Sequence, residues 1–131
     1  MKINSIIIRD AGRYVTEYLS LHLKKEYRYH SYTHTVEVVS ASEKITGELN
    51  LSKHETRILV TAAWFHDTGY TEGMENHEAT GASIAENFLK EKGVDDTDIE
   101  KVKACIMATL YPQKPQMLIE QILCDADLAH L

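Results

Sequence analysis

Apolar residues recur along most of the chain at the 3.6-residue spacing of amphipathic helices, and no window alternates cleanly between apolar and polar residues over the length of a strand. Only two prolines and six glycines interrupt this pattern. We therefore predict an all-α fold, a bundle of about six helices. The expected helices run from Ser5 to about Leu23, from about Ser31 to Leu49, from Ser52 to Gly69, from His77 to Lys92, from Asp96 or Thr97 to Pro112, and from Pro115 onward.

Local signals set several of these boundaries. Ser52 and Glu55 have the spacing of a capping box, which predicts the start of the third helix. Asn76 is a capping residue for the fourth helix, and Gly93 fits the left-handed position after its end. Two segments are expected to be irregular: the basic, aromatic stretch 24–32 and the polar stretch 70–75.

Length, charge and cysteine content narrow the class of protein. A chain of 131 residues fits one domain, residues 1–131, with a real core. The net charge of -6 argues against a sequence-independent nucleic-acid surface, so no nucleic-acid polymer is expected as a partner. The only two cysteines, Cys105 and Cys124, lie in apolar helical runs and imply buried thiols rather than a disulfide framework.

No segment has the pattern of a membrane span or signal peptide. The apolar run 6–8 is followed at once by Arg9 and Asp10, and it is too short for either role. The expectation is a cytoplasmic protein without a membrane partner. The pattern does not predict an oligomeric state.

Two histidines occupy positions where helical stripes usually carry aliphatic residues. His34 begins one stripe, and His66 ends another beside Asp67. A buried imidazole needs partners for both ring nitrogens. The last helix adds Asp125 and Asp127 close to apolar residues, where uncompensated carboxylates are costly to bury. A metal ion would provide that compensation, and imidazole with carboxylate suits Zn, Mn, Fe or Co better than Ca or Mg.

An alternative interpretation of these residues involves no metal ion. The His66–Asp67 pair can simply be a polar helix end, since short motifs often match by chance. Asp125 and Asp127 can both point to solvent beside the end of the last helix. The helical period alone does not decide which of these two carboxylates faces inward.

The ordered set of His34, His66–Asp67 and Asp127 resembles the H…HD…D signature of the HD-domain superfamily. The surrounding phrases agree with it, and the resemblance covers residues 29 to 131. The phrases are YHSYTH at 29–34, WFHDTGY at 64–70, NHE at 76–78 and DADL at 125–128. The resemblance implies an all-α HD-domain bundle and metal-dependent phosphohydrolase activity, commonly on nucleotides.

The resemblance also implies a set of metal ligands: His34, His66, Asp67 and Asp127. Asp127 is preferred to Asp125 because family members usually place this ligand after an alanine. The expected cofactor is one divalent transition metal ion, with no choice made among Mn, Fe, Co, Zn and Ni.

His77 matches a histidine that binds a second metal in binuclear members of the family. Those members usually carry a further histidine on the next helix, and residues 106–111 contain none. We therefore expect a mononuclear site.

Three residues are expected to serve the reaction itself: Asp67, His77 and Glu78. A metal-activated water would attack phosphorus, and Glu78 or His77 would carry the proton. Glu78 has an alternative role as a favourable charge at a helix N-terminus.

The cationic or hydrogen-bonding residues nearest to the motifs are Arg28, His30 and Lys114, so these are candidates for binding the substrate phosphate. Each has the alternative of being a solvated side chain. The expected substrate is a small phosphorylated molecule, a nucleotide in the first instance.

Two other functions stay open beside the hydrolase. One is a non-catalytic HD-fold regulatory module that binds a nucleotide or metal, and the other is a helical interaction module without an ion. The sequence ends at Leu131, whereas HD domains usually continue with at least one more helix. A C-terminal truncation is therefore one interpretation of this sequence.

Overall fold

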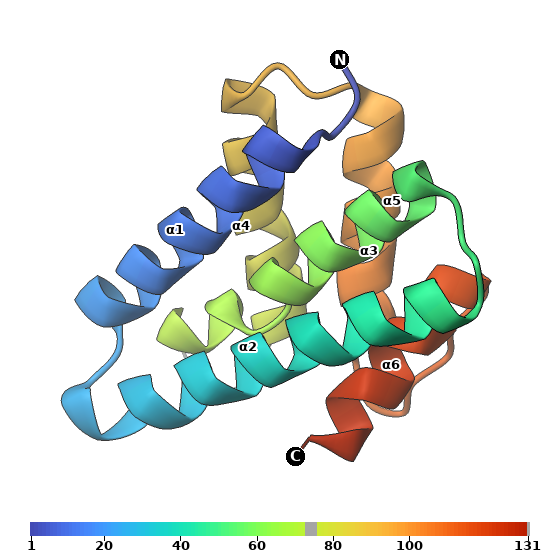
Figure 1. The fold of residues 1–131 in the computed structure, drawn as a ribbon. Coiled ribbons are helices and arrows are strands. Elements are labelled where there is room, and N and C mark those ends of the chain that lie inside the picture. Colours follow the sequence, from blue (N-terminus) through green and yellow to red (C-terminus); the bar gives the residue numbers. More distant parts are fainter. Residues whose placement is uncertain (73–75, 131) are drawn as a thin grey trace.

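The computed structural model describes residues 1–72 and 76–130, and the side chains of residues 29, 30, 71 and 72 are outside that description. Within this range the chain forms six α-helices and one short 3-10 helix, with no strand, so the predicted all-α fold is confirmed. Figure 1 shows their arrangement. The elements are α1 (Ser5–His22), α2 (Lys25–Glu48), α3 (Lys53–Phe65), η1 (Thr68–Glu72), α4 (His77–Glu91), α5 (Asp96–Ala108) and α6 (Leu118–Ala129).

Helix α3 is the centre of the fold and packs against all five other α-helices (Figure 1). Its sequence is apolar around most of its circumference, as expected for a helix surrounded by others. The buried residues of α3 are Ile58, Leu59, Val60, Thr61, Ala62, Ala63 and Phe65. Because the helix is fixed on every side, the residues that follow its C-terminal end are held in a defined position.

Helix α2 begins earlier than the sequence pattern predicts. It starts at Lys25, so most of the expected connector 24–32 is helical. This segment lacks an apolar stripe, but lysine, glutamate and arginine are good helix formers, and Glu26 in the first turn suits the helix dipole. No helix in the described ranges, this 24-residue one included, has the length and apolar character needed to cross a membrane.

The third helix ends at Phe65 rather than at the predicted Gly69. Two side chains cap the C-terminal end of this helix by donating hydrogen bonds to carbonyls of its last turn. His66 Nδ1 donates to Ala63 O at 2.6 Å, and Thr68 Oγ1 donates to Phe65 O at 2.8 Å. The 3-10 helix η1 follows. It includes Tyr70, although the stretch 70–75 was expected to be irregular. His66 and Asp67 thus lie in a turn and not on a continuous helix.

Two predicted helix starts differ in detail. Asn76 is the N-cap of α4 as expected, but it has a left-handed backbone (φ 57°) and no capping side-chain bond. Helix α6 begins at Leu118 rather than at Pro115, because the Glu120 carboxylate accepts a hydrogen bond from Gln116 N at 3.0 Å and holds the preceding chain outside the helix. Gly93 has the predicted left-handed conformation, with φ of 79°.

Two glycines allow α4 to approach the end of α3 closely. A Cβ atom at Gly81 would lie 3.0 Å from Phe65 O, and one at Gly69 would lie only 1.8 Å from His77 O. Any side chain at residue 69 would therefore overlap the first turn of α4. This approach places the N-terminus of α4 beside the turn that carries His66 and Asp67.

Both cysteines are buried, as the sequence predicts, and neither forms a disulfide. Burial raises the pKa of Cys105 to about 12 and that of Cys124 to about 11, and Cys124 Sγ donates to Ala108 O at 3.2 Å. Since the thiolate is the reactive form, we expect both thiols to react slowly with a disulfide reagent at pH 8 and rapidly in denaturant. Fast labelling of the folded protein would contradict this environment.

Candidate metal centre

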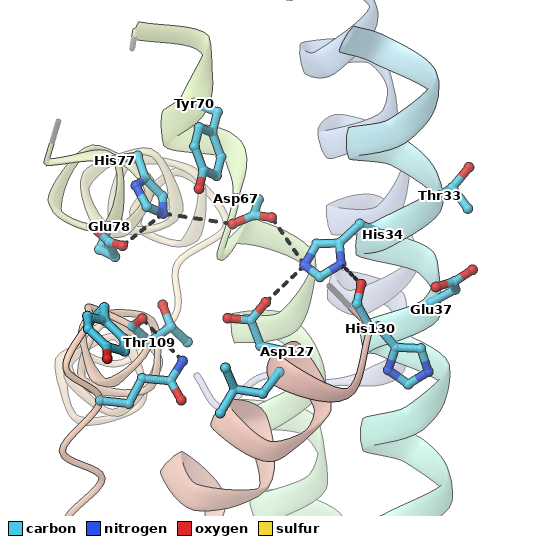
Figure 2. A pocket seen from close by; sticks show the side chains of 13 residues that line it. Thr33, His34, Glu37, Asp67, Tyr70, His77, Glu78, Thr109, Asp127 and His130 are labelled. Atoms are coloured by element: carbon cyan, nitrogen blue, oxygen red, sulfur yellow. Dashed lines mark hydrogen bonds and ion pairs between the residues drawn. The ribbon is translucent and has the colours of Figure 1, made fainter. Parts of the chain in front are cut away.

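Four polar side chains from three parts of the chain converge at one point. His34 comes from α2, His66 and Asp67 from the turn after α3, and Asp127 from α6. The Nε2 atom of His34 lies 2.9 Å from Asp127 Oδ1, 3.3 Å from Asp67 Oδ2 and 3.3 Å from His66 Nε2. Figure 2 shows His34 between the two carboxylates. Residues separated by 93 positions are thereby brought into direct contact.

His66 completes the cluster from the interior of the protein. Its side chain is fully buried, and its Nε2 lies 3.5 Å from both Asp67 Oδ2 and Asp127 Oδ1. Donor atoms of His34, His66 and Asp127 all lie within 4.8 Å of one another. Ligands that share one ion at bond lengths near 2.1 Å are separated by roughly 3.0–3.4 Å, so these contacts have the spacing of a single metal site.

The second ring nitrogen of each histidine is already occupied. His34 Nδ1 donates to the backbone carbonyl of His130 at 2.7 Å, and His66 Nδ1 donates to that of Ala63 at 2.6 Å. Carbonyl partners of this kind fix the ring orientation and direct Nε2 toward a metal. The donor set and its supports therefore fit a divalent transition metal.

The two carboxylates favour the protonated, positively charged form of both histidines. The hydrogen bond to Asp127 raises the pKa of His34. Burial alone would lower the pKa of His66, but the charges of Asp67 and Asp127 outweigh it and raise the pKa to about 9. Burial favours a neutral Asp127, yet the bonds from His34 and His66 hold its pKa well below its usual range. The two carboxylates thus favour positive charge at this point, and a bound metal ion would displace the protons of the imidazoles.

A second polar group lies at the edge of the cluster, at the start of α4. His77 Nε2 is 2.8 Å from Glu78 Oε2 and 4.0 Å from Asp67 Oδ1, and the Tyr70 ring stacks on the His77 ring at 4.0 Å (Figure 2). Glu78 is buried. Burial and the nearby acidic groups raise the pKa of Tyr70, so its hydroxyl keeps its proton. The predicted His77 and Glu78 therefore lie directly beside the predicted metal ligands.

These groups face an open pocket of about 520 Å³ (Figure 2). His66 lies behind its wall, fully buried. The volume falls within the range of about 300–1,000 Å³ that is common for small-molecule sites. The described lining residues are Thr33, His34, Glu37, Asp67, Tyr70, His77, Glu78, Thr109, Tyr111, Gln113, Asp127, Leu128 and His130.

Two of the predicted phosphate-binding residues, and the alternative ligand Asp125, do not belong to this pocket. Asp125 is exposed, whereas Asp127 is half-buried and points into the cluster. Arg28 and Lys114 are exposed and do not line the pocket. Arg28 instead donates from Nε to Leu23 O at 2.8 Å. The side chain of His30 lies outside the described residues.

His130 is the contributor that sequence reasoning missed. It lines the pocket, and its backbone carbonyl orients His34. No side-chain motif signals a contribution made by a backbone carbonyl. Thr109 and Gln113 were missed as well, although Lys114 of the same segment was a candidate. Both residues line the pocket, and the signal available was a set of polar residues directly after a helix that ends near the motifs.

Comparison with known proteins gives one result that bears on this site. A family model described as HD domain matches residues 31–130, more than half of the chain. No curated protein and no solved structure matches the chain. The matched region contains the complete cluster and the pocket around it. The chain therefore belongs to the HD domain family.

Proposed function

We propose that the protein is a phosphohydrolase that depends on one divalent transition metal ion and acts on a nucleotide or a related phosphate ester. HD domains are generally metal-dependent hydrolases. The observation that carries the proposal is the convergence of the His34, His66 and Asp127 donor atoms beside an open pocket.

Four residues of the proposed site would hold the ion: His34, His66, Asp67 and Asp127. When bound, a divalent ion supplies Lewis acidity, which lowers the pKa of a water molecule and screens the charge of a phosphoryl group. The bonds from His34 Nδ1 and His66 Nδ1 to backbone carbonyls keep both imidazoles oriented through the reaction. The buried position of His66 excludes water from the inner side of the site.

The pair of His77 and Glu78 would move the proton. Their 2.8 Å contact and the 4.0 Å separation between His77 and Asp67 form a short path from the ion site to the pocket wall. A carboxylate that shares a proton with an imidazole can accept one from attacking water and return it to a leaving group.

Replacing Glu78 with glutamine should therefore lower kcat by about 100-fold, within the usual contribution of a general acid or base, while metal content stays unchanged. Phosphate release and metal analysis on the same preparation measure the two effects. If the rate of the variant is undiminished, Glu78 is only a favourable charge at the start of α4, and His77 or a chain of water molecules carries the proton.

The first test of the proposal is metal content. Protein purified without chelator or metal-affinity resin should contain about one transition metal ion per chain, because a single N/O ligand set is formed. Protein that holds no metal and takes up neither Mn nor Zn would contradict the proposal and favour a helical interaction module. Two ions per chain would contradict only the mononuclear site.

The second test is turnover. Metal-loaded protein should release phosphate slowly from a nucleotide or a generic phosphate ester in the presence of Mn or Co. A loaded, folded protein without phosphate release across a nucleotide panel would instead favour the non-catalytic regulatory module.

A further inference from the structure

The candidate pocket has an unusual balance of charge for a phosphate site. All 14 lysines and arginines of the chain have described side chains, and none of them lines the pocket. The lining includes four carboxylates, from Glu37, Asp67, Glu78 and Asp127. Among the described lining side chains, only those of histidine could carry a positive charge beside a bound ion.

One ion does not neutralise all four carboxylates. Asp67 and Asp127, which contact both histidines, would balance a divalent ion. Glu78 is paired with His77. Glu37 lies on α2 one turn after Thr33, is exposed, and belongs to the pocket wall. A substrate therefore meets uncompensated negative charge outside the ion site.

The nearest lysine on this face of α2 is too distant to help. Lys44 lines a neighbouring groove that shares Glu37 and His130 with the pocket. It follows His34 by ten residues, about 15 Å along the helix axis. A chain of two or three phosphates that begins at the ion site does not reach it.

From this charge balance we propose that the pocket selects phosphate monoesters over the di- and triphosphates of the same alcohol. The inference rests on the proposed function and names its substrate class. Each additional phosphate adds negative charge to a pocket whose wall carries the exposed Glu37 carboxylate, and no lysine or arginine lines that wall. The organic part of a monoester has apolar contacts available from Tyr111, which is 85% exposed, and from Leu128.

The test compares AMP, ADP and ATP with metal-loaded protein at equal free divalent-ion concentration. We expect kcat/KM for AMP to exceed that for ATP by about tenfold or more, with ADP between them. The gap should narrow at high ionic strength, which screens charges near the surface. A value for ATP equal to or above that for AMP overturns the inference and leaves the hydrolase proposal intact.

A binding measurement separates the two proposals if turnover is absent. Should AMP, ADP, ATP and p-nitrophenyl phosphate all resist hydrolysis, the hydrolase proposal fails. Calorimetric titration of the same loaded protein then decides the inference alone. Tighter binding of AMP than of ATP supports it, and tighter binding of ATP, or binding of neither, overturns it.

A matched pair of charge reversals tests whether the selectivity comes from the pocket. Glu37→Lys should raise the ATP to AMP ratio of kcat/KM, or of affinity, by about three- to tenfold. Glu43→Lys makes the same charge change at an exposed residue of the same helix outside the pocket, and we expect the ratio to stay at its starting value. An equal shift in both variants would assign the effect to net charge and overturn the inference.

Discussion

Asp127→Ala should abolish metal retention, whereas Asp125→Ala should keep most of it. Asp127 Oδ1 lies 2.9 Å from His34 Nε2 and 3.5 Å from His66 Nε2, and Asp125 is exposed on the same helix. Loss of a residue that only supports a metal ligand costs about 10- to 100-fold in affinity, so loss of a ligand itself should cost more. Elemental analysis after gel filtration measures the difference.

A control variant and the metal content of the Asp125 variant decide whether Asp127 is the ligand. Asp127→Asn keeps the side-chain volume but removes the charge, so a folded Asp127→Asn variant that also fails to hold metal separates ligation from misfolding. Equal loss of metal in the Asp125 and Asp127 variants would leave the ligand unassigned. Loss in Asp125→Ala alone would show that the assignment is wrong.

Gly69→Ala should be among the most destabilising glycine-to-alanine substitutions in the chain. The new Cβ would lie 1.8 Å from His77 O and 2.9 Å from Gly81 N, both backbone atoms that a side-chain rotation cannot move. Overpacking usually costs about 1–3 kcal/mol, and we expect the free energy of unfolding to fall by at least the upper end of this range. Chemical denaturation measures the change.

Gly47→Ala is the matched control, because nothing lies within 4 Å of a Cβ at that position in α2. Alanine is favoured over glycine in a helix by about 0.8–1 kcal/mol, so this variant should be slightly more stable than the original chain. If the two substitutions change stability by similar amounts, the close approach of η1 to α4 does not exist in solution.

Much of the fold was predictable because the helices have distinct apolar stripes and strong end signals. Helix α1, for example, buries Ile7, Ala11, Val15 and Leu19, which follow one another at helical spacing. The start of α2 was not predictable in this way, since a solvated helix start has no apolar period to reveal it. Its residues are good helix formers, and Arg28 Nε donates to Leu23 O.

The candidate site was predictable only in part, for a physical reason. The types and order of His34, His66, Asp67 and Asp127 indicate metal chemistry, but the sequence pattern contains no distances between helices. The local motif layout placed Arg28 and Lys114 near the site, but neither residue lines the pocket in the packed structure. Substrate contacts depend on such packing, so they are the part that sequence reasoning recovers least.

The bond between His34 Nδ1 and the carbonyl of His130 also has a kinetic consequence. This carbonyl belongs to the C-cap of α6, one residue beyond the helix, and helix ends open locally far more often than whole domains unfold. Each opening would release the ring of His34 and withdraw Asp127 from its partners. The residence time of a bound ion should therefore follow the fraying rate of the last turn of α6, and amide exchange in that turn should slow when metal is added.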